Sequence, residues 1–447
     1  MKHRSNRSLL ILFCLIVLGG CGSSGIQTTT NGSNPNPNSN NSEPSQTTAE
    51  SFASALVQIN FFNLGSDFPP ALVIPDVPGM EGTAFVVTFT PTAVIPVDLE
   101  TGQVSAKFSI FDASTLAEAA FPNGLVITSA DRGYLLGATH VVVFNPSTGQ
   151  LLGSVDLTET INLTSSLPYS QAGDCNFDSI PESSVGPGPF NPSFPAAIAV
   201  VGQRLFVTMS NACFDAAFES FYVQGLLRVY DIQAGAPYLT KAAKSFLVLP
   251  GFNATALTVF GDRLFVTSTG DTSLQGSVNI PQSDSFLSEV NPLSLGIVNQ
   301  VNLGKVGANY QALAIDGDQG LAYVGSAAYS QVYQLNLNPL QILRGGSDPI
   351  VVSNVPDDYI TDQEMAWGSE VLFLSSFNQS AVLGLDLTAD NFPVLPQILD
   401  FSFPNNPGVT GAGPMALRPG QPGLDFGGPD LWVLTSTPGS LSHATTY

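Results

Sequence analysis

The chain has 447 residues and a formal net charge of −22, with only 11% charged residues and 44% hydrophobic residues. This apolar content supports a large buried core and excludes a wholly disordered chain. A protein with this negative charge repels phosphate backbones, so we do not expect nucleic acid as a partner. With three histidines and four cysteines, we do not expect a histidine-rich metal centre either.

The chain opens with a segment typical of export. Lys2, Arg4 and Arg7 precede an apolar run at 9–18, and small residues follow it. A basic start, a short apolar run and small residues predict a secretory signal. Ten apolar residues are too few to cross a bilayer as a helix, so the run does not predict a membrane span.

The end of this segment, Leu18-Gly19-Gly20-Cys21, resembles the lipobox of bacterial lipoproteins. The resemblance implies that residues 1–21 form a lipoprotein signal peptide and that Cys21 carries the lipid that anchors the protein in a membrane. By the same resemblance, Gly22 in place of Asp implies the outer membrane, on its periplasmic or extracellular face. The alternative is an ordinary signal peptide that contains a cysteine.

Residues 22–50 are rich in Ser, Asn, Thr, Pro and Gly and have almost no apolar content. Such a segment cannot form a core, and we predict a disordered polar tether with a root-mean-square reach of roughly 30 Å.

From residue 51 to 447 the sequence shows one recurring pattern and little helical periodicity. An apolar strand, a tight polar turn and a second strand centred on an aromatic residue recur at spacings of 49 to 72 residues. A third strand that often ends in an acid or amide follows, and then a turn and a fourth strand. The aromatic residues are Phe85, Tyr134, Phe206, Phe265, Tyr323, Phe373 and Trp432.

Four antiparallel strands in each of seven repeats predict an all-β, seven-bladed β-propeller. The repeats resemble the YVTN-type and quinoprotein-like propellers of bacterial surface proteins, most closely in 314–335 (AIDGDQGLAYVGSAAYSQVYQL). The resemblance implies the fold and transfers no functional residue. Because the repeat at Tyr134 is weak, six or eight blades stay possible.

The last repeat is too short for four strands, whereas Ala53–Phe62 stands alone before the first repeat. We therefore predict that this N-terminal segment pairs into the final blade and closes the ring. The long insertions at 157–194, 210–223, 269–285, 345–362 and 402–412 fall between second and third strands or between blades, so we predict that they project from one face around the channel mouth.

Two thiols remain after Cys14 leaves with the signal and Cys21 takes lipid. Cys175 and Cys213 lie in two insertions of the same predicted face, so in an oxidising compartment we expect a disulfide between them. Two free cysteines and a thiolate pair on a metal are the alternatives.

No residue is assigned a catalytic, cofactor-binding or metal-ligating role. His140 and His443 lie in no catalytic motif, and no Cys-x-x-Cys-His haem attachment is present. Carboxylates gather in two places along the chain, and convergent carboxylate oxygens could bind Ca²⁺ as a cofactor. The simpler interpretation is that these acidic side chains lie in loops and are solvated. The clusters are Asp357, Asp358, Asp362 and Glu364, and Asp174, Asp178, Asp215 and Glu219. We interpret Asp316-Gly317-Asp318 as a turn, not as a calcium loop.

These patterns together predict a lipoprotein of the cell envelope that acts as a binding or scaffolding module, with a protein or cell-surface polymer as its partner. One alternative is a lactonase-like or quinoprotein-like propeller enzyme, or a calcium-dependent binder, with a site at the channel mouth. Another is a structural subunit of an outer-membrane assembly.

Overall fold

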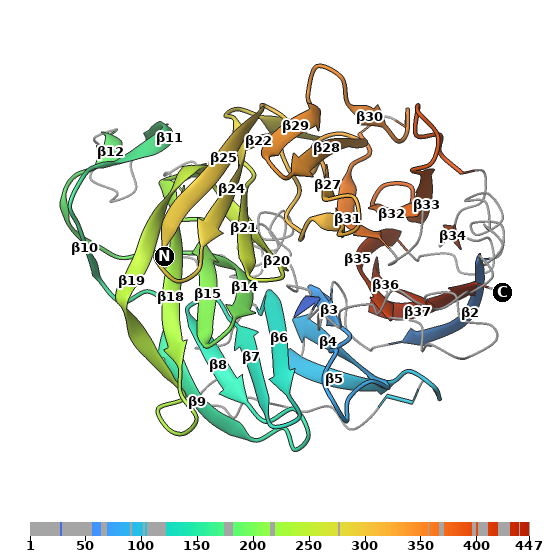
Figure 1. The fold of residues 1–447 in the computed structure, drawn as a ribbon, viewed down its shortest axis with the longest axis horizontal. Helices are drawn as coiled ribbons and strands as arrows, with labels where there is room; N and C mark the ends of the chain where they lie inside the picture. Colours follow the sequence, from blue (N-terminus) through green and yellow to red (C-terminus); the bar gives the residue numbers. More distant parts are fainter. Residues whose placement is uncertain are drawn as a thin grey trace, which may run out of the picture.

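A computed structural model describes residues 27–28, 56–63, 69–89, 92–101, 103–104, 122–173, 182–214, 220–275, 278–355, 357–365, 371–395, 399–400, 410–418, 430–437 and 439–446. These residues contain strands and no helix, and the sheets stand around a common centre (Figure 1). Among them, then, no helix is long and apolar enough to cross a membrane.

Six sheets in the described part of the chain have at least four strands. In chain order, their strands are β6 (Gly124–Ser129), β7 (Arg132–Leu136), β8 (His140–Phe144) and β9 (Leu151–Asp156); β14 (Pro195–Val201), β15 (Arg204–Met209), β18 (Gln224–Ile232) and β19 (Leu239–Phe252); β20 (Ala254–Phe260), β21 (Arg263–Ser268), β24 (Ser285–Asn291) and β25 (Gly296–Gly304), joined by β1 (Gln27–Thr28); β26 (Ala314–Asp316), β27 (Leu321–Gly325), β28 (Gln331–Leu337) and β29 (Leu340–Arg344), joined by β30 (Ile350–Val351); β31 (Ile360–Met365), β32 (Val371–Ser376), β33 (Ala381–Asp386) and β34 (Leu399–Asp400); and β35 (Thr410–Arg418), β36 (Asp430–Thr437), β37 (Gly439–Thr446) and β2 (Leu56–Asn63).

The prediction of seven four-stranded blades is met only in part. The sheet of β3 (Ala71–Val73), β4 (Thr83–Phe89) and β5 (Thr92–Asp98) has three strands among the described residues. After β5 the chain returns to this sheet in a single bridge between Val97 and Val104, and residues 105–121 lie outside the description. The structure therefore supports an all-β propeller with six sheets of four or more strands.

The recurring aromatic residues all lie on the second strand of a sheet, as predicted. Each is almost completely buried, because both faces of a propeller sheet pack against neighbouring sheets. Trp432 of β36, for example, packs in one cluster with Leu72, Ala84 and Ile95 of the three-stranded sheet. The last sheet of the chain thus packs directly on the first.

The predicted closure of the ring by the N-terminal segment is confirmed. Strand β2 runs antiparallel to β37, with Leu56 opposite Thr446 and Asn63 opposite Ser440 (Figure 1). The strand begins at Leu56, three residues later than the predicted segment. This pairing gives the last sheet its fourth strand from the opposite end of the chain.

The sheets present two different ends. One end, which we call the turn face, carries the short connections between first and second strands and between third and fourth strands.

Asx turns form many of these connections: Asp98 Oδ1 accepts from the backbone N–H groups of Glu100 and Thr101 at 3.0 and 2.8 Å. The hydrogen bond from Thr101 is the main cause of the lowered pKa of Asp98. Asp316 Oδ1 accepts in the same way from Asp318 and Gln319, which confirms a turn there.

The opposite end, which we call the loop face, carries the connections between second and third strands and between successive sheets. The long insertions that the structure describes all leave the sheets at this end. Of the insertion at 402–412, residues 402–409 lie outside the description.

Candidate functional site

Additional two-stranded hairpins build the loop face between the β6 sheet and the β26 sheet. They are β10 (Ile161–Leu163) with β13 (Gly188–Phe190), β11 (Leu167–Gly173) with β12 (Glu182–Val185), β16 (Ala212–Phe214) with β17 (Ser220–Tyr222), and β22 (Thr272–Gln275) with β23 (Val278–Pro281). Figure 1 shows β11 and β12 at the outer side of the ring. The insertion at 157–194 thus reaches outward, and does not lie wholly around the channel mouth as predicted.

The hairpins β11–β12 and β16–β17 pack on each other. The rings of Tyr169 and Phe221 lie 5.5 Å apart between centroids, and Tyr169 forms a β-bridge with Val223. The backbone N–H of Tyr222 donates to Ser170 Oγ at 3.0 Å. Apolar contact and directional bonds together fix one arrangement of these insertions.

Ser170 also connects these hairpins to the next sheet through Asp271. Its side chain forms a hydrogen bond with the carboxyl group of Asp271, which lies between β21 and β22 and is 2% exposed. Burial raises the pKa of Asp271, and the bond to Ser170 opposes that shift. Burial also raises the pKa of Tyr222, with smaller contributions from Tyr310 and Asp271 nearby. A carboxyl group and two phenols therefore lie close together at this junction.

Cys213 lies on β16, directly opposite Phe221 of β17, and is disulfide-bonded. Cys175 lies outside the described residues, so the pairing of Cys175 with Cys213 stays a prediction. Gly173, at the end of β11, lies against the Phe221 ring. A Cβ at position 173 would lie 2.4 Å from Phe221 Cζ. The chain that leads to Cys175 thus passes beside the residue opposite Cys213.

Replacing Gly173 with alanine is expected to separate the two hairpins without opening the ring, because the new methyl group would overlap the buried Phe221 ring. We expect faster hydrogen exchange in 167–173 and 220–223 and unchanged exchange in β27. Gly186 is the control, because a Cβ there meets nothing within 4 Å. Equal exchange in the Gly173→Ala and Gly186→Ala proteins would contradict the packing.

The predicted acidic cluster at 357–364 does not converge on one point. Asp358 is buried and accepts hydrogen bonds from Ser330 Oγ, Ser376 Oγ and Gln379 Nε2 at 2.7 to 3.1 Å. These donors satisfy the carboxylate and join two loop-face turns. Asp357 is exposed at a positive φ of 61°.

Asp362 and Glu364 form a separate pair on β31, the first strand of its sheet. Asp362 accepts from the backbone N–H of Gln363 at 2.8 Å and of Met415 on β35 at 2.7 Å. Burial raises the pKa of both carboxyl groups, and the charge of Asp362 raises that of Glu364 further. Both causes act in the same direction, and no hydrogen bond that would favour the ionised form of the Glu364 carboxyl group occurs among the described residues.

The other sequence candidates carry no site in the described residues. His140 begins β8, with Nδ1 2.8 Å from Thr139 Oγ1, and His443 lies on β37, where side chains are largely outside the description. Cys21, Asp174, Asp178, Asp215 and Glu219 lie outside the described residues altogether. Within the described part of the chain, no three His, Cys, Asp or Glu side chains gather to hold a metal ion.

Three arginines that the sequence analysis missed join successive sheets at the turn face. Arg132, Arg204 and Arg263, the interblade arginines, each begin a second strand and donate to carbonyl groups in a turn of the next sheet. Arg204 reaches Pro292 O at 2.9 Å and also pairs with Asp231 of its own sheet at 3.2 Å. The signal was present as an arginine just after the polar turn in three of the repeats.

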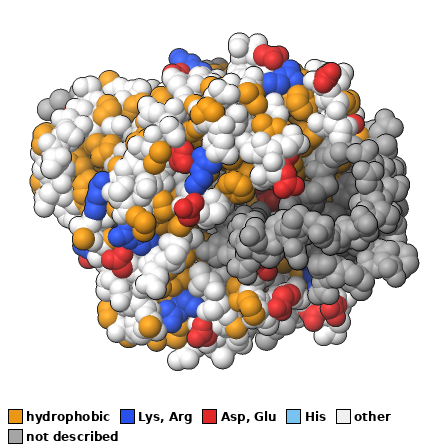
Figure 2. Space-filling view, viewed as in Figure 1, with side chains coloured by type: hydrophobic (Ala, Val, Ile, Leu, Met, Phe, Trp, Pro, Cys, Tyr) orange, Lys and Arg blue, Asp and Glu red, His pale blue; other side chains and the backbone are white. Residues whose placement is uncertain are grey.

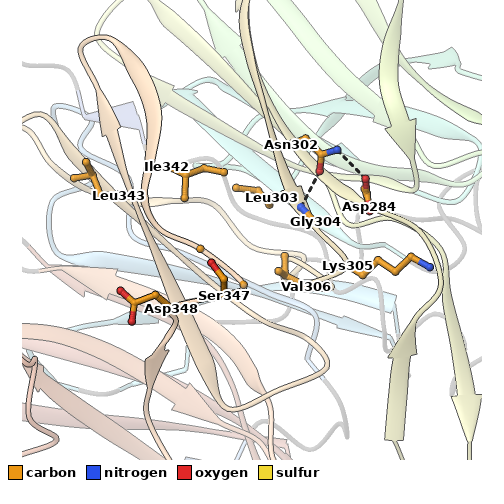
Figure 3. A pocket seen from close by; sticks show the side chains of 12 residues that line it. Asp284, Asn302, Leu303, Gly304, Lys305, Val306, Ile342, Leu343, Ser347 and Asp348 are labelled. Carbon is orange, nitrogen blue, oxygen red and sulfur yellow. Dashed lines mark hydrogen bonds between the residues drawn. The ribbon is translucent and has the colours of Figure 1, made fainter.

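An open pocket of about 670 Å³ lies between β25 and the chain that follows β29 (Figure 3). Asn302 donates to Asp284 at 2.7 Å and accepts from Gly304 N at 2.7 Å. Asp348, at the other side, pairs with Arg344 at 3.0 Å. Asp284 and Asp348 therefore both have partners, Asn302 and Arg344, and the lining of the pocket does not identify a ligand.

The face shown in Figure 2 is largely uncharged, with single acidic and basic side chains scattered between apolar ones. This agrees with a chain in which 11% of residues are charged. Among the described residues drawn in this view, no large patch of Lys and Arg side chains gathers, as a polyanionic partner would favour.

No protein-family model and no curated protein sequence matches the chain. Among solved structures, the β-propeller domain of Cps50 (Swd1) from Myceliophteria thermophila aligns with 88% of this chain and 100% of its own, at 13% identity and a TM-score of 0.51. Hydrazine synthase from Kuenenia stuttgartiensis (12% identity, TM-score 0.43, 72% of this chain and 80% of that chain) and Hsv2 from Kluyvelomyces marxianus (6%, 0.46, 83% and 90%) are also similar. The first similarity, together with the ring of sheets, establishes that this chain folds as a β-propeller.

Proposed function

We propose that this protein is an exported β-propeller, anchored by lipid on Cys21 in the outer membrane, that binds a protein or cell-surface polymer through its loop face. The N-terminal segment supports the anchor through its basic start, its apolar run and the lipobox-like 18–21. The propeller supplies a rigid support from which loops project, the arrangement that binding loops commonly use. In this proposal the three-stranded sheet counts as a seventh blade, and Cys175 is the partner of Cys213.

The observation that carries the binding function is the mutual packing of the loop-face hairpins. Hairpins β11–β12 and β16–β17 take no part in the ring of sheets, yet Tyr169, Ser170 and Phe221 hold these two in one arrangement. The bond from Ser170 to Asp271 connects them to the start of the β22–β23 hairpin. A preorganised surface loses less conformational entropy when a partner binds than a loose loop does. We infer that these hairpins present a fixed recognition surface.

The test compares two variants of the lipidated protein in affinity capture from detergent-solubilised envelopes of the producing cells. In the first, 272–281 is replaced by Asn-Gly, because the N–H of Gln282 already bonds Asp271 O at 2.7 Å and the ends therefore meet. In the second, turn-face Leu293, which is 80% exposed, is replaced by serine. We expect a component that co-purifies with the wild-type and Leu293→Ser proteins and is lost with the shortened hairpin.

Both variants must unfold at the wild-type temperature for this comparison to hold. Retention of every captured component by the hairpin variant, or loss of the component with Leu293→Ser instead, would contradict binding through the loop face.

A further inference from the structure

The turn between β24 and β25 is fixed by two cations of the preceding sheet. Arg204 of β15 donates to the carbonyl groups of Pro292 and Leu293 at 2.9 and 2.7 Å. Lys244 of β19 donates to the carbonyl groups of the next two residues, 294 and 295. Four successive carbonyl groups are therefore bonded from outside the turn, and these charge-assisted bonds hold its backbone in place.

This fixed turn presents apolar side chains to solvent. Leu293 is 80% exposed, and Ile297 and Val298 at the start of β25 are 37% and 54% exposed. Single exposed apolar residues are common on protein surfaces, but a local group of them marks an interaction site. Because the backbone of the turn is already fixed, a partner that covers Leu293 orders little more than its side chain.

An open pocket of about 480 Å³ lies beside this turn. Residues 243–248 of β19 line it, and four of the six are apolar. The strand bulges here, because residues 242–245 lie opposite the single residue Val229 of β18. Lys244 lines the pocket and also bonds the turn that carries Leu293, so the pocket and the exposed leucine are neighbours.

We propose that Leu293 of one copy of this chain enters the β19 pocket of a second copy, and that the reciprocal contact forms at the same time. A two-fold dimer uses the same surface on both subunits, so a surface that holds a protruding side chain beside a hollow is complementary to itself. We call Leu293, Ile297, Val298 and residues 243–248 the dimer patch.

The composition of the dimer patch favours a second copy as its occupant. None of its residues is acidic, so two chains with a net charge of −22 meet here without placing carboxylates of the patch against each other. A small apolar molecule would fill the pocket but leave Leu293 in water, whereas a second copy covers both.

The dimer patch leaves the loop face free. Its strands β19 and β25 are each the outermost described strand of their sheet, and they lie at the outer side of the ring (Figure 1). The proposal therefore depends neither on the lipid anchor nor on the loop-face partner.

The test measures the mass of the assembled full chain by sedimentation equilibrium in detergent at increasing protein concentration. We expect the mass of one chain at low concentration and of two chains at high concentration. Leu293→Asp is expected to raise the dimer dissociation constant at least about tenfold, because it removes buried apolar area and brings a carboxylate into an apolar pocket.

Leu343→Asp is the matched control. It introduces the same charge at a leucine that is 44% exposed on β29, outside the dimer patch, and it should associate as the wild type does. A single-chain mass at every concentration up to about 1 mM would overturn the dimer, as would equal weakening by the two substitutions. A mass that grows beyond two chains would overturn the two-fold arrangement in favour of a head-to-tail contact.

A mixed disulfide tests the contact itself. Ala243 is exposed and lines the pocket, so oxidation of a mixture of Leu293→Cys and Ala243→Cys proteins should join the two chains. A mixture of Leu293→Cys and Leu343→Cys proteins should give several-fold less of the mixed product. Equal yields from the two mixtures would show that Leu293 does not enter the pocket of the second copy.

Discussion

Replacing Arg263 with methionine is expected to lower the free energy of unfolding by about 3 kcal/mol, because it removes charge-assisted bonds and leaves a carboxylate poorly compensated. Arg263 bonds Glu289 at 2.7 Å within its sheet, and Leu337 O at 2.8 Å and Asn338 Oδ1 at 2.9 Å in the next sheet. Its guanidinium group also lies 4.8 Å from the centre of the Phe265 ring. Urea unfolding at pH 7, followed by tryptophan fluorescence, measures the loss.

Arg344 is the matched control for this prediction. It pairs with Asp348 at 3.0 Å, but Asp348 is 70% exposed, and such a pair contributes between 0 and about 1 kcal/mol. Arg344→Met should therefore unfold at nearly the wild-type urea concentration. Equal losses in the two variants would show that the bonds across the sheets do not stabilise the ring.

Glu289 gives the Arg263 prediction a dependence on pH. Burial raises the pKa of Glu289, but the bonds from Arg263 and Asn299 and the charge of Arg263 outweigh it, so the pKa is lowered overall. A lowered carboxyl pKa stabilises the folded state above the unfolded value near 4, and that stabilisation is lost as the pH falls. The difference between wild type and Arg263→Met should therefore shrink below about pH 4.

Replacing Glu364 with glutamine is expected to stabilise the protein at pH 8 and to change little at pH 4.5. Burial and the charge of Asp362 raise the Glu364 pKa well above its usual value. Between the unfolded pKa near 4 and the raised folded pKa, the folded state holds a proton that the unfolded state has released, so wild-type stability falls as the pH rises. Each unit by which the folded pKa of Glu364 exceeds its unfolded pKa lowers the free energy of unfolding by up to about 1.4 kcal/mol at high pH. Glutamine does not ionise, so the Glu364→Gln protein does not lose this stability.

Thermal unfolding between pH 4.5 and 8 tests this expectation. The matched control is Glu100→Gln, which changes an exposed carboxylate. It should follow the wild-type curve, whereas the Glu364→Gln curve should rise above it progressively with pH. A gain that does not vary with pH, or a loss at pH 8, would contradict a carboxyl group held protonated by its surroundings.

The architecture was predictable because its main signal repeats along the chain. Phe206 and Phe265 occur in nearly identical contexts, and each fills the same buried place on a second strand. The pairing of β2 with β37 was also predictable, since an unclosed ring would leave unpaired strand edges. The sheet with three described strands was not singled out in advance: the repeats at Phe85, Tyr134 and Trp432 are all weaker than the others, yet the sheets of Tyr134 and Trp432 each have four described strands.

The candidate site was harder to predict from the sequence, because residues that are far apart in the chain make its contacts. Nothing near Ser170 in the chain indicates that it bonds both Tyr222 and Asp271. The acidic cluster misled for a related reason: Asp358 and Asp362 are four residues apart, yet they bond separate sets of donors. Spacing along a strand fixes which face a carboxylate occupies, but not which groups meet it there.

The pairing of β2 with β37 constrains how the molecule is made. During synthesis β2 emerges before all the sheets of the ring, whereas β37, the strand with which it pairs among the described residues, emerges after all the other described strands. The intermediate sheets can pack in order as they appear, but the final one stays incomplete until β37 has been synthesised. A stalled or truncated chain would therefore display two open strand edges, a state that proteases and chaperones can distinguish from the finished ring.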